Sequence, residues 1–412
     1  MARWISAGVW LAPALGALLA WSLLIQQRQP HFIADERIHH GVVEKIAAGE
    51  AAPANLPMLP AYHYLVAAIS DLLGGATLAR TRGVTTALAA CAILALWAAA
   101  RSRTLAESDT HARFVTLVFN PIWFAFAPLA YTETAAQLGL ALILLGVARH
   151  WLWLAVAGLA CAAAARQSNL AWIPLVAAWI AQAAWRSAPA TQRFRGVALA
   201  LAPLALVLVL PLASLAIGRR LVPPPNDPNQ ARLNVAQIYL YLLTLAVVFA
   251  PSLLNALVRQ RRILLDLLTS GWRAALLLAA VGAVWLGYHN PHPWNGDTNY
   301  LRNLVLVTLQ TDASFRMACS VVIVVSLAGW AALSAEQPQR SRWLALAAFA
   351  SAYVGVHWLA DPRYYIAPIL LMNFAMHAQR TALRAQAAWQ ILLSAALAGF
   401  VWMHGDVHGG VP

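Results

Sequence analysis

The sequence predicts an all-α bundle of membrane-spanning helices, and three observations support this fold class. Hydrophobic residues make up 61% of the 412-residue chain and charged residues only 10%, so the chain carries more apolar surface than a soluble fold can bury. The mean hydropathy is +0.64. The apolar residues form runs long enough to cross a bilayer, separated by short breaks that contain arginine. We therefore expect one integral-membrane domain over residues 1–412.

The length of each apolar run determines where a span is expected, since crossing a bilayer takes about 20 residues. The first run follows Arg3 and has no small-residue cleavage site at its end, so we expect a retained helix and no signal peptide. On this basis the sequence predicts about thirteen spans, near residues 6–25, 84–100, 114–129, 134–148, 151–165, 170–185, 196–216, 235–256, 274–288, 317–334, 343–358, 364–378 and 387–403.

The first outer loop, residues 26–83, is predicted to carry two helices at the membrane surface. Asp35 is a suitable N-cap for a helix that runs to about Ala48. The segment 58–73 contains Pro60 near its start, and we expect it to be a juxtamembrane or re-entrant helix. A further crossing here would reverse the orientation of every later span.

Basic residues orient the later spans, because cytoplasmic loops favour Lys and Arg. The formal charge of +13 comes from 28 basic against 15 acidic residues. The arginines cluster in the breaks, where they set orientation and contact anionic lipid headgroups, so nucleic acid is not expected as a partner. With Arg3 inside, most acids lie on the outer side. The proline-rich outer loop 217–234 is predicted to be extended or to form a short lid.

Five short polar segments interrupt the apolar runs, and this topology puts all five on the outer side. Acids, amides and arginines are costly in a bilayer unless they face a cavity or a partner. We therefore expect them to build one site at the outer face. The five segments are Asp35-Glu36, Tyr131-Thr132-Glu133, Arg166-Gln167-Ser168-Asn169, Asn295-Gly296-Asp297-Thr298-Asn299 and Asp361-Pro362-Arg363-Tyr364-Tyr365.

Asp35 and Glu36 form the carboxylate pair best suited to catalysis. One carboxylate can accept a proton from an attacking hydroxyl while its neighbour orients a partner. The alternative is an N-cap beside a solvated acid. Glu133 either faces a cavity as a functional residue or links two neighbouring helices. Arg166 either holds a phosphate or extends to lipid headgroups. Arg363, beside two tyrosines, suits a phosphate or a sugar.

No metal or cofactor is predicted. His289, His292 and Asp297 lie within nine residues, but a His-x-x-His spacing with a proline between matches no strong ligand pattern. The three cysteines lie in apolar runs and are expected to be packing residues. The chain has no Walker loop, dinucleotide fingerprint, Gly-x-Ser-x-Gly or HExxH motif, which disfavours nucleotide-driven transport and serine or zinc hydrolysis.

Four motifs, in order over nearly the whole chain, resemble those of the endoplasmic-reticulum α-1,2-glucosyltransferases. This family adds the terminal glucose to the dolichol-linked oligosaccharide and belongs to the multi-span GT-C glycosyltransferases. The family has Asp in place of Glu133, Glu in place of Asp361 and Lys in place of Thr298. The motifs are Asp35-Glu36-Arg37-Ile38-His39, Arg166-Gln167-Ser168-Asn169 followed by Trp172, Gly296-Asp297-Thr298-Asn299, and Pro362-Arg363-Tyr364-Tyr365.

The resemblance implies a GT-C fold and an inverting transfer of a hexose, with glucose expected, from a polyprenyl-phosphate donor to a lipid-linked or envelope glycan. It implies no cofactor. Asp35 is expected to be the catalytic base with Glu36 beside it, and Arg363 and Arg166 are expected to bind the donor phosphate. The residues expected to contact sugar or acceptor are Glu133, Asp297, Asn299, Tyr364, Tyr365 and His39.

The alanine- and arginine-rich composition indicates a bacterial chain, so we expect a location in the inner membrane with the site facing the periplasm. Three alternatives remain open. A GT-C mannosyl- or arabinosyltransferase would share the acid in the first loop. A polyprenyl-lipid flippase or transporter should instead show charges at the bilayer midplane and related broken helices. A structural partner in an envelope complex would need no mutual geometry among the five segments.

Overall fold

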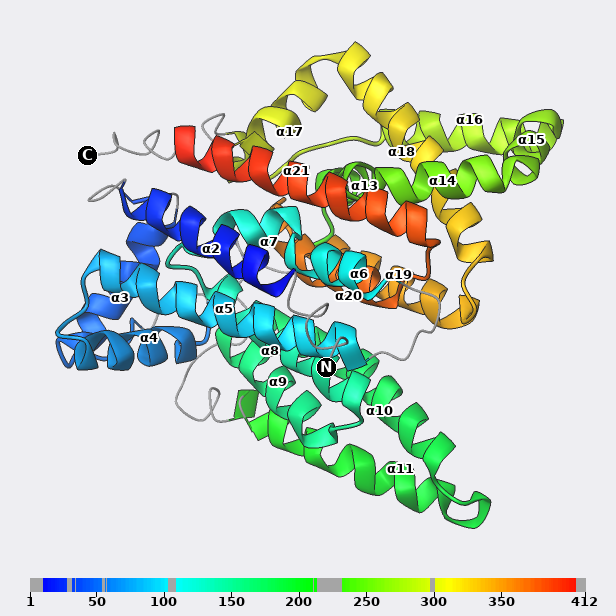
Figure 1. Cartoon of the computed structure of the whole chain (residues 1–412). Helices are drawn as coiled ribbons and strands as arrows, with labels where there is room; N and C mark the ends of the chain where they lie inside the picture. The colour runs from blue at the N-terminus through cyan, green and yellow to red at the C-terminus, as the bar shows by residue number, and fades with distance from the viewer. Residues whose placement is uncertain are drawn as a thin grey trace. The chain divides into compact units, whose positions relative to one another are not determined.

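The chain is helical throughout the part that the structure describes. The computed structural model describes residues 10–27, 32–33, 35–53, 56, 58–102, 109–209, 211–212, 232–296 and 301–404. Within these ranges the regular elements are α-helices and short 3-10 helices (Figure 1), which confirms the predicted all-α fold class. The chain divides into two compact units. Unit 1 comprises residues 1–106, 117–221 and 394–412, and unit 2 comprises 107–116 and 222–393. The single domain stays a prediction.

Membrane-spanning length is found in only some of the described helices. The helix pair α13 (Val235–Val248) and α14 (Ala250–Arg259) would make one further span, but it bends by 74° at the break. The described residues thus support an integral membrane protein, and the thirteen spans and the GT-C type stay predictions. The four helices long and apolar enough to cross are α5 (Leu78–Ser102), the segment Ala190–Leu208, α18 (Ala313–Ala335) and α21 (Arg380–His404) over Arg380–Met403.

Unit 1 begins with α2 (Leu11–Gln26), followed by two short helices that pack on one another, α3 (Glu36–Ala47) and α4 (Ala61–Leu72). Each has 12 residues, or about 18 Å at 1.5 Å per residue, whereas the hydrocarbon layer is about 30 Å thick. Neither helix is long enough to cross the bilayer. Two helices are present where the sequence predicts them, and their place at the membrane surface stays a prediction.

The helices α8 (Thr132–Arg149) and α9 (Leu152–Ala165) form a close hairpin in unit 1. His150 adopts a left-handed conformation, with φ of 59°, at the turn between them. A Cβ atom added at Gly139 would lie 2.4 Å from the backbone nitrogen of Ala162, so glycine is required where the two backbones touch. The antiparallel hairpin brings the start of α8 beside the end of α9, where Glu133 and Arg166 lie.

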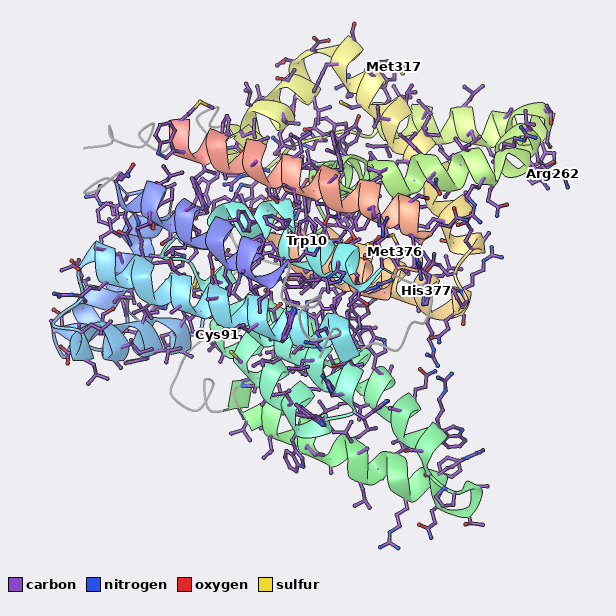
Figure 2. All side chains as sticks on the ribbon, viewed as in Figure 1. Trp10, Cys91, Arg262, Met317, Met376 and His377 are labelled. Atoms are coloured by element: carbon purple, nitrogen blue, oxygen red, sulfur yellow. The ribbon has the colours of Figure 1, made fainter. Side chains whose placement is uncertain are left out.

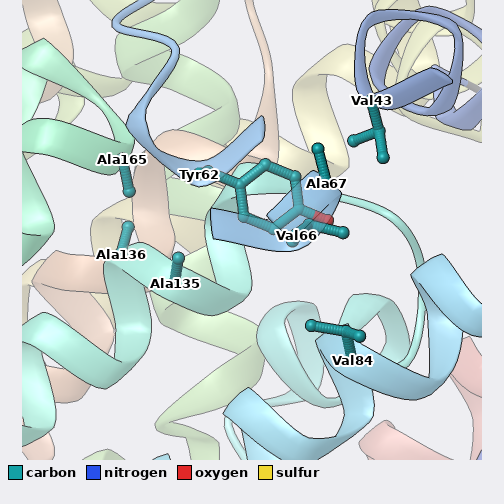
Figure 3. Packing of buried hydrophobic residues seen from close by; sticks show 8 residues of the cluster. All are labelled: Val43, Tyr62, Val66, Ala67, Val84, Ala135, Ala136 and Ala165. Carbon is teal, nitrogen blue, oxygen red and sulfur yellow. The ribbon is translucent and has the colours of Figure 1, made fainter. Parts of the chain in front are cut away.

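A buried cluster joins α3 and α4 to this hairpin (Figure 3). Because α3, α4, α5, α8 and α9 all contribute to it, the polar segments at the ends of these helices are held on a common apolar base. The cluster consists of Val43, Tyr62, Val66, Ala67, Val84, Ala135, Ala136 and Ala165.

The predicted span 114–129 is interrupted, because Asn120-Pro121 separates α6 (Thr110–Val118) from α7 (Pro121–Phe126). Proline cannot donate a helical hydrogen bond, so it begins a new helix. Cys91, labelled in Figure 2, lies on α5. It is exposed, which makes the predicted packing role wrong for this cysteine. Unit 1 continues through η1 (Gln167–Trp172), α10 (Ile173–Ser187), η2 (Ala190–Gln192), α11 (Arg193–Leu201) and η3 (Ala202–Leu208).

In unit 2, a buried arginine closes the end of α20. Arg113 donates to the carbonyl oxygens of Asn373, Phe374 and Met376 at distances of 2.9 to 3.2 Å, so it satisfies groups that a helix end leaves unpaired. Figure 2 labels Met376 and His377 at this break. Besides α13, α14 and α18, unit 2 contains α15 (Arg261–Thr269), α16 (Gly271–Leu286), η4 (Pro293–Gly296), α17 (Leu301–Thr311), α19 (Arg340–Gly355), η5 (Pro362–Tyr365) and α20 (Ile366–Ala375).

Candidate active site

Glu36, predicted to be catalytic, lies fully buried at the start of α3 and forms an ion pair with Arg82 of α5. One carboxylate oxygen accepts from Arg82 Nε at 3.0 Å and from the Ala130 N–H at 2.8 Å. The other accepts from Arg82 Nη2 at 2.5 Å and from the Ile33 N–H at 2.9 Å. Both side chains are 0% exposed. Four donors thus occupy the carboxylate, and this arrangement favours holding the backbone in place over accepting a substrate proton.

The ion pair ties together segments that are distant in the sequence. Arg82 also donates from Nη1 to the carbonyl oxygen of Ile25, near the end of α2, at 3.1 Å. The pair therefore connects the ends of α2 and α3 with α5 and with the turn before α8. A buried charge is tolerated only where it is paired and hydrogen-bonded. Separating any one of these segments from the others would therefore break the buried pair.

Asp35, the predicted base, occupies the N-cap position of α3, but its side chain accepts no capping hydrogen bond. Its backbone N–H donates to the Tyr131 hydroxyl at 2.5 Å, and that hydroxyl donates to the carbonyl oxygen of Ile33 at 3.4 Å. The capping role expected for Asp35 is thus wrong. Its half-buried carboxylate follows a turn that Glu36 and Tyr131 hold from two sides.

Histidines occupy the next turn of α3. His39 shares a 3.0 Å hydrogen bond with His63 of α4, and its ring centroid lies 5.3 Å from that of Tyr131. His40 lies 3.1 Å from Glu44 and 3.1 Å from the Thr81 hydroxyl. Burial lowers the pKa of His40 despite the neighbouring acids. His39 lies next to the Asp35 turn, and its predicted contact with sugar or acceptor stays a prediction.

Glu133 and Arg166 form an ion pair at the open end of the α8–α9 hairpin. Glu133 is 3% exposed and Arg166 is 19% exposed, so the carboxylate lies beneath the guanidinium. The next residue, Gln167, is also held in place, because its side-chain oxygen accepts a hydrogen bond from the Leu59 N–H at 3.1 Å. The structure thus brings together two predicted site residues whose separate roles stay predictions.

In unit 2, one buried carboxylate joins two arginines. Asp361 Oδ2 accepts from Arg302 Nη1 at 2.9 Å, from Arg363 Nε at 2.9 Å and from Arg363 Nη2 at 2.6 Å. Burial alone would raise the pKa of Asp361, but the two guanidinium charges hold it well below its usual range. The carboxylate is therefore ionised at neutral pH.

The two tyrosines after Arg363 point to different neighbours. Tyr365 is buried and donates to the Gln237 side-chain oxygen at 2.9 Å, and the same oxygen accepts from the Asp361 N–H at 3.1 Å. The Tyr364 ring packs on His357, with 3.8 Å between ring centroids. Tyr365 is thus part of the frame of the site, and Tyr364 lies against a titratable ring.

The five predicted segments divide between the units: three lie in unit 1 and two in unit 2. Asp297 and Asn299 lie outside the described residues. Within the described ranges, no group of three or more His, Cys, Asp or Glu residues is placed to hold a metal ion.

Arg82, Arg302 and Gln237 were not predicted as site residues. Arg82 and Gln237 lie within otherwise apolar segments that become α5 and α13, where a polar side chain needs a partner. That cost is a usable signal in the sequence. It cannot identify the partner, because Glu36 is 46 residues from Arg82 along the chain.

Comparison with known proteins adds one relationship. Residues 55–196 match the model of the DIE2/ALG10 family, a family of endoplasmic-reticulum α-1,2-glucosyltransferases. No curated protein and no solved structure matches. The matched segment contains Arg82, Glu133 and Arg166 but neither Asp35 nor Arg363. It agrees at family level with the resemblance found in the motifs, and it indicates a membrane glycosyltransferase that acts on a lipid-linked glycan.

Proposed function

We propose that the protein is an inverting glycosyltransferase that moves a hexose, glucose by family resemblance, from a polyprenyl phosphate to a hydroxyl of a lipid-linked or envelope glycan. The outer face of a bacterial inner membrane is the proposed location. The family match over residues 55–196 supports the reaction class. The donor class, the stereochemistry and the location belong to the proposal.

One observation carries the choice of base. Glu36 is fully buried with four donors on its carboxylate, whereas its neighbour Asp35, at the N-cap position of α3, is partly exposed. A general base needs an oxygen that can reach the substrate proton. We therefore assign the base to Asp35, and we assign to Glu36 the role of holding the turn that carries it.

In the proposed step, an acceptor hydroxyl attacks the anomeric carbon on the face opposite the phosphate. The bond between that carbon and the phosphate oxygen breaks, the hydroxyl proton passes to Asp35, and polyprenyl phosphate leaves with the bonding electron pair. A lipid phosphate is a good leaving group, so cations that neutralise it supply the rest of the stabilisation.

The cations available for the phosphate differ between the units. In unit 1, Arg166 is matched by the single carboxylate of Glu133. In unit 2, the two guanidinium groups of Arg302 and Arg363 lie against the carboxylate of Asp361. This difference favours Arg363 over Arg166 as the phosphate ligand. Glu133 and Arg166 are then proposed to contact the sugar or the acceptor, together with Tyr364 and His39.

The test is transfer by purified protein from a panel of polyprenyl phosphates carrying glucose, mannose or arabinose. Asp35→Asn should lower turnover about 10²- to 10⁴-fold, because an amide cannot accept the proton, and should leave the melting temperature unchanged. Near-normal turnover by a normally folded Asp35→Asn variant would overturn the assignment. Preference for mannose or arabinose would replace glucose and leave the reaction class intact.

A further inference from the structure

Two buried hydrogen-bond donors in unit 2 lack partners among the described residues. They are Nε2 of Gln237 and the hydroxyl of Tyr241, and both side chains are 0% exposed. An unsatisfied polar group in a protein interior costs about 1 to 3 kcal/mol, and more where no water can reach it. Two such groups on one helix indicate that a molecule other than the chain supplies acceptors there.

The orientation of the Gln237 amide is determined by its neighbours. Its side-chain oxygen accepts from the Asp361 N–H at 3.1 Å and from the Tyr365 hydroxyl at 2.9 Å. Only the oxygen of an amide can accept two such bonds, so the NH₂ group must point the other way. The side chain therefore offers two N–H donors and no further strong acceptor.

Tyr241 lies one helical turn after Gln237, on the same face of α13. Its ring centroid lies 5.2 Å from that of Tyr365, and Tyr365 in turn donates to Gln237. The two donors therefore border the same tyrosine. A ligand that satisfies both must present oxygen acceptors.

The adjacent charges select an anion. Gln237 accepts from the backbone of Asp361, whose carboxylate is shared by Arg302 and Arg363. The carboxylate is 2% exposed, whereas the two arginines are 16% and 14% exposed. The negative charge thus lies beneath the two guanidinium groups, whose donor edges suit the oxygens of a phosphate.

We infer that Gln237, Tyr241 and Arg302 join Arg363 in binding the phosphate of the lipid donor. This inference rests on the proposed function and adds to it three residues that the sequence did not indicate. Arg302 and Arg363 supply the charge, and Gln237 and Tyr241 donate to phosphate oxygens from the helix behind them.

The experiment titrates the purified full-length protein in detergent with a polyprenyl monophosphate and follows the rise in melting temperature. Tyr241→Phe removes one oxygen and Gln237→Glu replaces the NH₂ donor while keeping both acceptor contacts. Tyr241→Phe should weaken binding about 10-fold, the worth of one hydrogen bond to a charged group. Gln237→Glu should weaken it by at least as much, because its carboxylate also repels the phosphate. Tyr241→Phe should not lower the melting temperature without ligand, because its hydroxyl has no partner in the described part of the chain.

Tyr239→Phe is the matched control on the same helix. The Tyr239 hydroxyl donates to the carbonyl oxygen of Arg316 at 2.9 Å and shares a 3.0 Å hydrogen bond with Ser320. Its loss should lower the melting temperature without ligand and leave the affinity for the lipid phosphate unchanged. Inorganic phosphate and phosphatidylglycerol micelles serve as comparison ligands, and both should protect the wild-type protein much less than the polyprenyl monophosphate.

The outcomes separate this inference from the proposed function. Wild-type affinity in both Tyr241→Phe and Gln237→Glu would overturn the inference and leave the proposed function standing. Equal protection by phosphatidylglycerol or inorganic phosphate would also overturn it, because the site would then bind anions in general. A wild-type protein that neither binds polyprenyl monophosphate nor transfers sugar would overturn both.

Discussion

Glu36→Gln gives the sharpest prediction about how the fold holds the candidate base. The substitution keeps the shape of the side chain but replaces one carboxylate oxygen with an NH₂ group. Each carboxylate oxygen accepts one bond from Arg82 and one from a backbone N–H. The new NH₂ therefore faces two donors, two bonds are lost, and the buried ion pair with the guanidinium is broken.

Breaking a buried ion pair in this way costs about 3 to 5 kcal/mol, and no discount for solvent applies because both side chains are 0% exposed. Glu44→Gln is the matched control, since Glu44 lies on the same helix with its side chain 57% exposed and should change stability by less than about 0.5 kcal/mol. In a double-mutant cycle, Glu36→Gln and Arg82→Met should be strongly non-additive.

The assay is reversible unfolding in mixed micelles, combined with hydrogen exchange of the native protein. In Glu36→Gln either the Ile33 or the Ala130 amide loses its acceptor, because the two bond different oxygens of Glu36. That amide should exchange faster, and the other should follow because the broken ion pair loosens both segments. Equal stabilities for Glu36→Gln and Glu44→Gln, or unchanged exchange in both segments, would refute the reasoning.

Three further predictions concern other parts of the chain. Arg363→Lys should raise the donor KM about 10-fold, because an ammonium cannot keep the two-point grip of a guanidinium; a lower melting temperature with an unchanged KM would instead mark a structural role. The pKa of His40 is lowered by burial, so its contribution to stability is fully present above the unfolded value of about 6.5 and is lost as pH falls from that value through the lower pKa of the folded state. Replacing His40 with Asn should flatten the dependence of melting temperature on pH between 7 and 5, and an unchanged slope would contradict this. Gly139→Ala should cost about 1 to 3 kcal/mol because its Cβ would lie 2.4 Å from Ala162 N, whereas Gly83→Ala, with nothing within 4 Å, should be neutral or stabilising; equal effects would show that the helices separate easily.

Much of the fold follows from the apolar runs of the sequence. The predicted span 317–334 corresponds to α18, and 387–403 lies within α21. The sequence was less informative where helices break. It predicted one span over 235–256, but the chain bends by 74° between α13 and α14. Apolar content measures what a segment can bury and carries little information about its direction.

The candidate site was predictable residue by residue but not contact by contact. Asp35, Glu36, Glu133 and Arg363 were visible as charges that a membrane protein must accommodate. The family resemblance indicated Asp35 as the base, but the local sequence offered no physical reason to prefer it to Glu36, because Arg82 reaches Glu36 only in the folded chain. Local patterns indicate which residues need partners, and the fold decides which partners they obtain.

The most direct test of the central claim follows one labelled sugar. Purified protein is incubated with a β-linked polyprenyl-phosphate [¹³C]glucose and a lipid-linked glycan, and NMR determines the linkage of the label in the product. An inverting transferase with Asp35 as base should give an α-glucoside, which Asp35→Asn should fail to form. The absence of transfer from any polyprenyl-phosphate sugar, a β-linked product, or an α-linked product formed equally well by folded Asp35→Asn protein would contradict the account.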